Sequence, residues 1–103
     1  MSQLLIMEDD RDIASLYSRV LEEKGHKVML AHTAEKCLKI YSKRLHEVRT
    51  KKSVTNDTHP FDTVILDYKM PDRNGLEVAK EIITYNSRQR TKLCLCIYRR
   101  YGF

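Results

Sequence analysis

The sequence lacks several features that would place the protein in a membrane or outside the cell. No apolar run has the length of a membrane span, and the N-terminus lacks the basic and apolar regions of a secretion signal. The three cysteines are an odd number without a disulfide-like framework, which fits a reducing compartment. None of the four histidines has metal-ligand spacing. We therefore expect a soluble cytoplasmic protein without a membrane partner.

Acidic residues are absent from the last part of the chain. No Asp or Glu follows Glu81, whereas five Lys or Arg residues do, so the net charge of +5 lies entirely in this segment. A neutral body with a basic tail favours nucleic-acid binding much less than a uniformly basic domain does. We expect no direct nucleic-acid binding, and a binder driven by the basic tail is the minor alternative.

The 103 residues suffice for one domain, and the 42% hydrophobic content supports a folded core. Apolar patterns alternate between strand and helix periods along the chain. The predicted strands are 3–7, 27–31, 63–66 and 92–98, and the predicted helices are 10–24, 33–48 and 76–85. This alternation implies right-handed crossovers and a parallel sheet covered by helices. A polar, solvated loop is expected at 51–60.

Helix boundaries and faces follow from individual residues. Asp10 and Thr33 are expected to cap the first two helices, and Gly25 is expected to end the first. The apolar residues of the first helix recur at the spacing of one helix face. They are Ile13, Leu16, Tyr17, Val20 and Leu21.

Two predicted strands end directly on carboxylates. Glu8, Asp9 and Asp10 follow the first strand, and Asp67 follows the third. Because ligands bind at the carboxyl ends of parallel strands, we expect these groups to share one rim of the sheet. Clustered carboxylates repel one another unless a cation neutralises them, and such oxygen ligands suit Mg²⁺. Asp67 is then a candidate nucleophile toward phosphorus.

Plainer interpretations exist for each half of this pattern. The acidic run could be only a helix N-terminal cluster, and Asp67 could be a loop carboxylate that accepts backbone N–H groups. The occurrence of both, each after an apolar strand, favours a site. A metal-dependent hydrolase of small phosphate esters is disfavoured because no second acid–base residue is evident. Cys94 and Cys96 are not expected to reach one metal ion together.

These residues resemble a known family. Met7-Glu8-Asp9-Asp10 after the first strand, and the segment LDYKMPDRNGLE at 66–77, are similar to the CheY-like receiver domain of two-component response regulators. The resemblance covers residues 3–90 and includes both acidic motifs, their order and the Met-Pro turn. It implies a three-layer α/β/α, flavodoxin-like parallel sheet. Pro71 and Gly75 are interpreted as turn formers.

The resemblance also implies a function. Asp67 would be the phosphoacceptor for a histidine kinase or phosphotransfer protein in a phosphorelay. Glu8, Asp9, Asp67 and the main-chain carbonyl of Lys69 would organise Mg²⁺. The protein would then be a signalling phosphoprotein and not an enzyme, apart from self-catalysed phosphorylation and dephosphorylation.

The C-terminal region departs from the family pattern. The family has a Ser or Thr at the end of strand four and a Lys at the end of strand five, whereas here the candidate fourth strand ends on Ile97-Tyr98-Arg99. We expect a single domain, 1–103, with an incomplete sheet of about four strands and an atypical tail at 91–103. Either the receiver is truncated, which we favour, or it is a minimal receiver that completes its sheet with another chain. The alternative function is that of a truncated, switch-defective receiver that acts only as an interaction module or is a non-functional fragment. Arg99 or Arg100 is a weak candidate to replace the missing Lys.

Overall fold

The computed structural model describes residues 2–50 and 60–96. Nearly all of the predicted polar loop, the end of the predicted last strand, Arg99 and Arg100 lie outside the described residues. The elements are β1 (Gln3–Met7), α1 (Arg11–Glu23), β2 (Lys27–Ala31), α2 (Ala34–Thr50), β3 (Thr63–Asp67), α3 (Gly75–Tyr85), the 3₁₀ helix η1 (Ser87–Lys92) and β4 (Leu93–Cys96).

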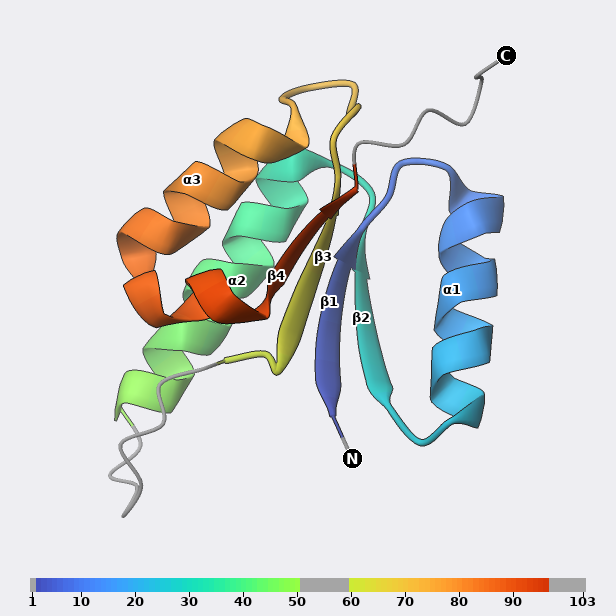
Figure 1. The fold of residues 1–103 in the computed structure, drawn as a ribbon, viewed down its shortest axis with the longest axis horizontal. Coiled ribbons are helices and arrows are strands. Elements are labelled where there is room, and N and C mark those ends of the chain that lie inside the picture. Colours follow the sequence, from blue (N-terminus) through green and yellow to red (C-terminus); the bar gives the residue numbers. More distant parts are fainter. Residues whose placement is uncertain (1, 51–59, 97–103) are drawn as a thin grey trace.

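The four strands form one parallel sheet in the order β2-β1-β3-β4. Helix α1 lies on one face of this sheet, and α2 and α3 lie together on the other (Figure 1). The predicted three-layer α/β/α class and parallel sheet are therefore confirmed. The strands predicted at 3–7 and 27–31 have the observed bounds of β1 and β2.

The helix starts follow from side chains that accept otherwise unpaired backbone N–H groups. Asp10 Oδ1 accepts the N–H groups of Asp12 at 3.0 Å and Ile13 at 3.1 Å. Thr33 Oγ1 accepts the N–H of Lys36 at 3.1 Å, so both predicted caps are confirmed. Helix α1 ends before Gly25, whose φ of 92° is the left-handed conformation that glycine adopts readily.

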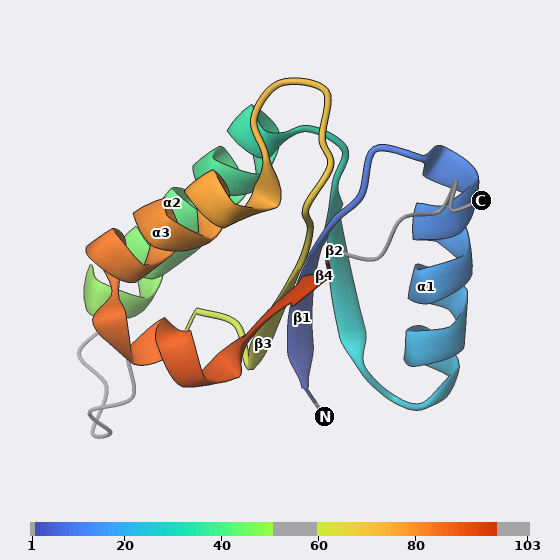
Figure 2. The ribbon, with the colours of Figure 1, turned by 45° about the horizontal axis from the view of Figure 1, so that its top comes forward.

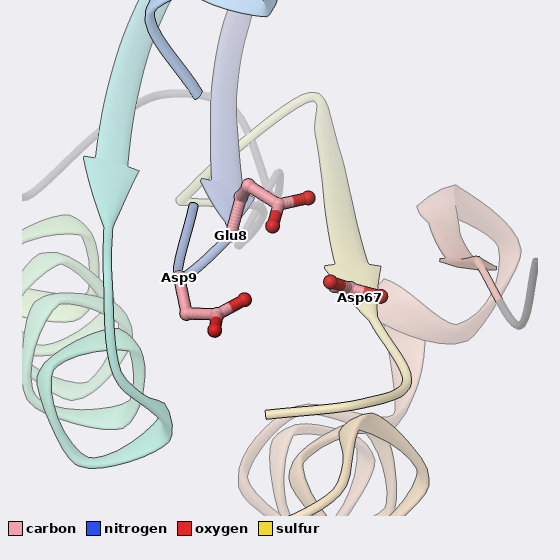
Figure 3. Close-up of side chains that lie close together, drawn as sticks. All are labelled: Glu8, Asp9 and Asp67. Atoms are coloured by element: carbon pink, nitrogen blue, oxygen red, sulfur yellow. The ribbon is translucent and has the colours of Figure 1, made fainter. Parts of the chain in front are cut away.

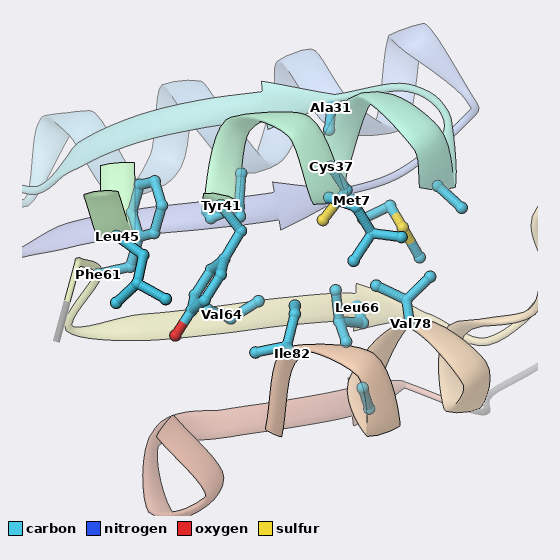
Figure 4. Close-up of a cluster of buried hydrophobic side chains, with 14 residues drawn as sticks. Met7, Ala31, Cys37, Tyr41, Leu45, Phe61, Val64, Leu66, Val78 and Ile82 are labelled. Carbon is cyan, nitrogen blue, oxygen red and sulfur yellow. The ribbon is translucent and has the colours of Figure 1, made fainter. Parts of the chain in front are cut away.

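The main hydrophobic core fills the space between the sheet and the pair α2 and α3 (Figure 4). Parallel strands alternate their side chains, so every second residue of β1 and β3 points into it. Tyr41 and Phe61 are its largest buried side chains, with ring centroids 6.2 Å apart. The other strand and helix residues in this core include Leu5, Met7, Ala31, Cys37, Leu45, Val64, Leu66, Val78 and Ile82.

A buried polar network lies at the end of this core where β3 begins. The Tyr41 hydroxyl donates a hydrogen bond to Gln89 Oε1 at 2.8 Å, and Gln89 Nε2 donates to the main-chain oxygens of Phe61 at 3.2 Å and Lys92 at 3.1 Å. Gln89 is completely buried, so these partners satisfy groups that water cannot reach. The network fixes η1, which the sequence did not predict, to α2 and to the start of β3.

The opposite face is covered less completely. Only Ala14 of α1 is buried, whereas Leu16, Tyr17 and Val20 are 54%, 43% and 44% exposed. The apolar stripe of α1 is therefore only partly covered. Helix α1 lies beside β2 on this face, without a second helix from the described part of the chain to cover its flank (Figure 2).

Candidate functional site

Three carboxylates meet at the carboxyl ends of β1 and β3. Glu8, Asp9 and Asp67 each offer an oxygen atom, and these atoms all lie within 4.8 Å of one another (Figure 3). The parallel register pairs Met7 with Leu66, so the residues that follow the two strands emerge side by side. The sheet thus brings together acids that are separated by almost sixty positions in the sequence.

Hydrogen bonds fix the position of Glu8, which follows β1 and pairs with the end of β2. Its residue is 3% exposed, its N–H donates to the oxygen of Ala31 at 2.9 Å, and His32 Nδ1 lies 3.0 Å from its main-chain oxygen. Its carboxylate accepts the N–H of Asp10 at 3.1 Å. These contacts fix the direction of a charged side chain that would be costly to bury unpaired.

Asp10 has a different role from the two acids before it. Its carboxylate accepts N–H groups in the first turn of α1, and it does not belong to the cluster of three. The interpretation of the acidic run as a helix N-terminal feature therefore applies to Asp10, whereas Glu8 and Asp9 lie close to Asp67 (Figure 3).

Asp67 is the last residue of β3 and is only 6% exposed. The next residue, Tyr68, donates its N–H to the oxygen of Cys96 at 2.8 Å, so the chain remains paired with β4 at this point. Lys69 follows in the loop, where its side chain is exposed. Its main-chain carbonyl as a metal ligand stays a prediction.

Gly75 allows α3 to start directly over the end of β3. A Cβ atom at this position would lie 2.4 Å from the main-chain oxygen of Asp67, a distance that backbone atoms do not tolerate. The Gly75 N–H also donates to the oxygen of Tyr68 at 2.7 Å. Gly75 is the first residue of α3 and has no positive φ. The close approach of its Cα to the backbone of Asp67 therefore explains why glycine is needed here, whereas the predicted role in a turn does not.

Asp72 anchors the loop between β3 and α3 to the start of α2. Its two carboxylate oxygens accept the N–H groups of Ala34 and Glu35, each at 3.0 Å. Slight burial acts to raise the pKa of Asp72, but hydrogen bonds from these N–H groups outweigh it and hold the pKa below its usual range. No local pattern in the sequence indicates this contact, because the partners are 37 and 38 positions apart.

Cys96 is the residue of β4 that stands opposite Asp67 in the register. Burial raises the pKa of its thiol, and so do the Cys94 thiol and the carboxylates of Asp67 and Glu8. Cys94 and Cys96 share one face of β4, because side chains two residues apart in a strand point the same way, and their thiols contact each other. The premise that Cys94 and Cys96 point to opposite faces was therefore wrong, whereas their joint contact with one metal ion is untested.

The chain matches known receiver proteins over most of its length. The profile of the response regulator receiver domain family matches residues 4–96. The transcriptional regulatory protein CpxR of Klebsiella pneumoniae is 29% identical over 82 residues, which cover 80% of this chain and 28% of CpxR. The response regulator SaeR of Staphylococcus aureus is 28% identical over 82 residues, which cover 80% of this chain and 29% of SaeR. The chain thus spans less than a third of the length of these curated relatives.

Solved structures show the same fold. The response regulator TrrA of Thermotoga maritima, in a complex with Mg²⁺ and BeF, is 24% identical with a TM-score of 0.70, covering 100% of this chain and 90% of that chain. A complex of the histidine kinase ThkA with TrrA gives 29% identity and a TM-score of 0.69, covering 100% of this chain and 75% of that chain.

The described helices include none with the length and apolar character needed to cross a membrane. Together, the acidic ends of β1 and β3, the parallel sheet and the match over residues 4–96 assign the chain to one family. It belongs to the response regulator receiver domain family.

Proposed function

We propose that this receiver domain accepts a phosphoryl group on Asp67 within a two-component phosphorelay. The single observation that carries the proposal is the meeting of Glu8, Asp9 and Asp67 within 4.8 Å. Asp67 lies at the end of a central strand, where its position is set by the paired backbone of β3 and by the start of α3 above it. A nucleophile held in this way needs little rearrangement to attack in line.

The residues present fit a hard divalent cation. Carboxylate and carbonyl oxygens are the ligands that Mg²⁺ takes in proteins, and like charges this close repel one another without a cation. Glu8, Asp9, Asp67 and the main-chain carbonyl of Lys69 would hold Mg²⁺, with Glu8 acting through water. When bound, the ion would neutralise charge on the phosphoryl oxygens. The Mg²⁺ complex of TrrA supports this assignment.

The reaction at Asp67 is a group transfer between two side chains. A carboxylate oxygen attacks phosphorus, the P–N bond of a phosphohistidine breaks, and its electron pair returns to the imidazole, which takes up a proton. The product is an acyl phosphate on Asp67, and attack by water on phosphorus later releases inorganic phosphate. The added charge beside the loop at 68–74 would bias its arrangement and so carry the signal.

The phosphoryl donor is proposed to be a histidine kinase or a phosphotransfer protein. The complex of ThkA with TrrA supports a kinase partner. We also propose a cytoplasmic location, no direct nucleic-acid binding, and no catalysis beyond self-phosphorylation and dephosphorylation. A single domain over 1–103 with an atypical tail at 91–103 stays a prediction, while the family match itself extends to residue 96.

The test is phosphorylation by a small donor, followed by intact mass spectrometry. With acetyl phosphate and Mg²⁺, we expect one phosphoryl group per chain, removed by hydroxylamine. Asp67→Asn should abolish the adduct, whereas the exposed Asp12→Asn should retain it. Chelation of Mg²⁺ by EDTA should also prevent labelling.

Circular dichroism of both variants would show whether they fold. An adduct that persists in folded Asp67→Asn would place the nucleophile elsewhere. Mg²⁺ binding without any adduct in the folded wild type would contradict the proposal and support the alternative, a switch-defective interaction module. If phosphorylation fails, the exposed apolar residues of α1 would support the interaction module.

A further inference from the structure

We propose that Cys94 and Cys96 form a binding site for a thiophilic divalent cation such as Zn²⁺, next to the proposed magnesium site and sharing only Asp67 with it. The two thiols lie on one face of β4, and both residues are exposed. Side chains at positions i and i+2 of a strand share a face, with their Cα atoms about 6.6 Å apart. The thiols contact each other across this separation.

Contact between two thiols on one strand is a suitable arrangement for a thiophilic ion. Thiolates prefer Zn²⁺ and similar thiophilic ions, whereas Mg²⁺ prefers oxygen ligands. The thiol pair would therefore select Zn²⁺, and the neighbouring carboxylates would select Mg²⁺. Binding would displace the two thiol protons to solvent, and each sulfur would donate an electron pair to the ion.

The surroundings of the pair add negative charge. Cys96 stands opposite Asp67 in the strand register, and the carboxylates of Asp67 and Glu8 interact electrostatically with its thiol. Zn²⁺ accepts carboxylate oxygen alongside sulfur, so Asp67 is the oxygen donor that β3 places next to the pair. Water would complete the coordination, because this end of β4 is open to solvent.

Cys37 provides the matched control within the same chain. It is fully buried in the core between α2 and the sheet, and burial raises the pKa of its thiol to about 12. A metal ion in solution cannot reach it without unfolding. Any thiolate signal from the folded protein must therefore come from Cys94 and Cys96.

The experiment is a titration of the full chain with Cd²⁺, a spectroscopic substitute for Zn²⁺, in a non-thiol reductant and excess Mg²⁺. Ultraviolet absorbance reports the charge-transfer band of cadmium–thiolate bonds. We expect one Cd²⁺ per chain for the wild type and for Cys37→Ala. Cys94→Ser and Cys96→Ser should each weaken binding at least about tenfold and lower the band. Circular dichroism checks that each variant is folded.

Two results would overturn the proposal. One is unchanged binding in folded Cys94→Ser or Cys96→Ser, which would locate the ion on the carboxylates alone. The other is a wild type without any thiolate band. Asp67→Asn should retain the band with weaker binding, and its loss in that folded variant would also contradict the site. No phosphoryl donor is present, so these outcomes are independent of whether Asp67 is phosphorylated.

Discussion

The two faces of the sheet differ in how completely they are covered. On one face, α2 and α3 together bury strand residues such as Leu5 and Leu66 at 0% exposure. On the other face, α1 is the only helix of the described residues, and it leaves Leu16 and Val20 about half exposed, at 54% and 44%. Since free energy from apolar burial scales with the area removed from water, the first face must supply most of the stability.

The residues that stabilise the fold and the residues proposed to react or bind ions also lie on different parts of the molecule. The covered face contains the core and the Tyr41 network, whereas the carboxylate cluster and the two exposed thiols lie at the rim and on the open face. Groups that must meet a phosphoryl donor or an ion need access to solvent. The molecule therefore concentrates packing on one face of the sheet and keeps reactive groups at the rim and on the open face.

The largest expected contrast is in thiol reactivity. At pH 8, a thiol reagent followed by mass spectrometry should modify the exposed Cys94 far faster than Cys37, because Cys37 is completely buried and its pKa is raised to about 12, while the reagent needs an accessible thiolate. Urea should remove the contrast by unfolding the core. Equal rates in the native protein would show that the α2–α3 face is not closed.

Matched leucine truncations compare the two faces directly. Leu5→Ala should lower the free energy of unfolding by about 2–5 kcal/mol, because it leaves a cavity in a fully buried site. Leu16→Ala on exposed α1 should change it by less than about 0.5 kcal/mol. Urea denaturation measures both values. Similar losses in the two variants would mean that α1 is buried in solution.

Tyrosine variants test the polar network on the covered face. Tyr41→Phe should destabilise the protein by about 1–3 kcal/mol, because the buried Gln89 loses its hydrogen-bond donor. Tyr85→Phe removes a hydroxyl that donates to the Glu81 carboxylate on the protein surface, and should have a smaller effect. Thermal melts compare the two. A loss in Tyr85→Phe as large as that in Tyr41→Phe would contradict the assigned roles.

A smaller loss than that of Tyr41→Phe is expected at the rim, where Asp72 caps α2. Asp72→Ala should lower the free energy of unfolding by about 0.5–1 kcal/mol at pH 7. The pKa of Asp72 is lower in the folded protein, so its contribution is present above the ordinary pKa of about 3.9 and disappears as the pH falls through the folded value.

Urea denaturation of the wild type and Asp72→Ala at pH 7 and pH 3 would measure this change. The difference between the two proteins should shrink at pH 3. Asp72→Asn, which keeps an acceptor oxygen without a charge, serves as the control and should lose this pH dependence. If the wild type and Asp72→Ala differ in free energy of unfolding by the same amount at both pH values, the Asp72 carboxylate does not cap α2.

Much of the fold could be predicted because local signals and the global pattern agree. Apolar runs marked the strands, and Asp10 and Thr33 marked helix starts, because caps act within three residues in sequence. The 3₁₀ helix η1 was missed because no periodicity identifies it. Its position depends on the contact between Gln89 and Tyr41, 48 residues apart.

The sequence by itself determined the alternation of strands and helices and the four acids at the ends of β1 and β3, because periodicity and strand ends are local properties. The tertiary structure alone decided which acids meet, which face of α1 remains exposed, and that Cys96 lies beside Asp67. These facts depend on strand order and register, which arise from packing between residues far apart in the chain.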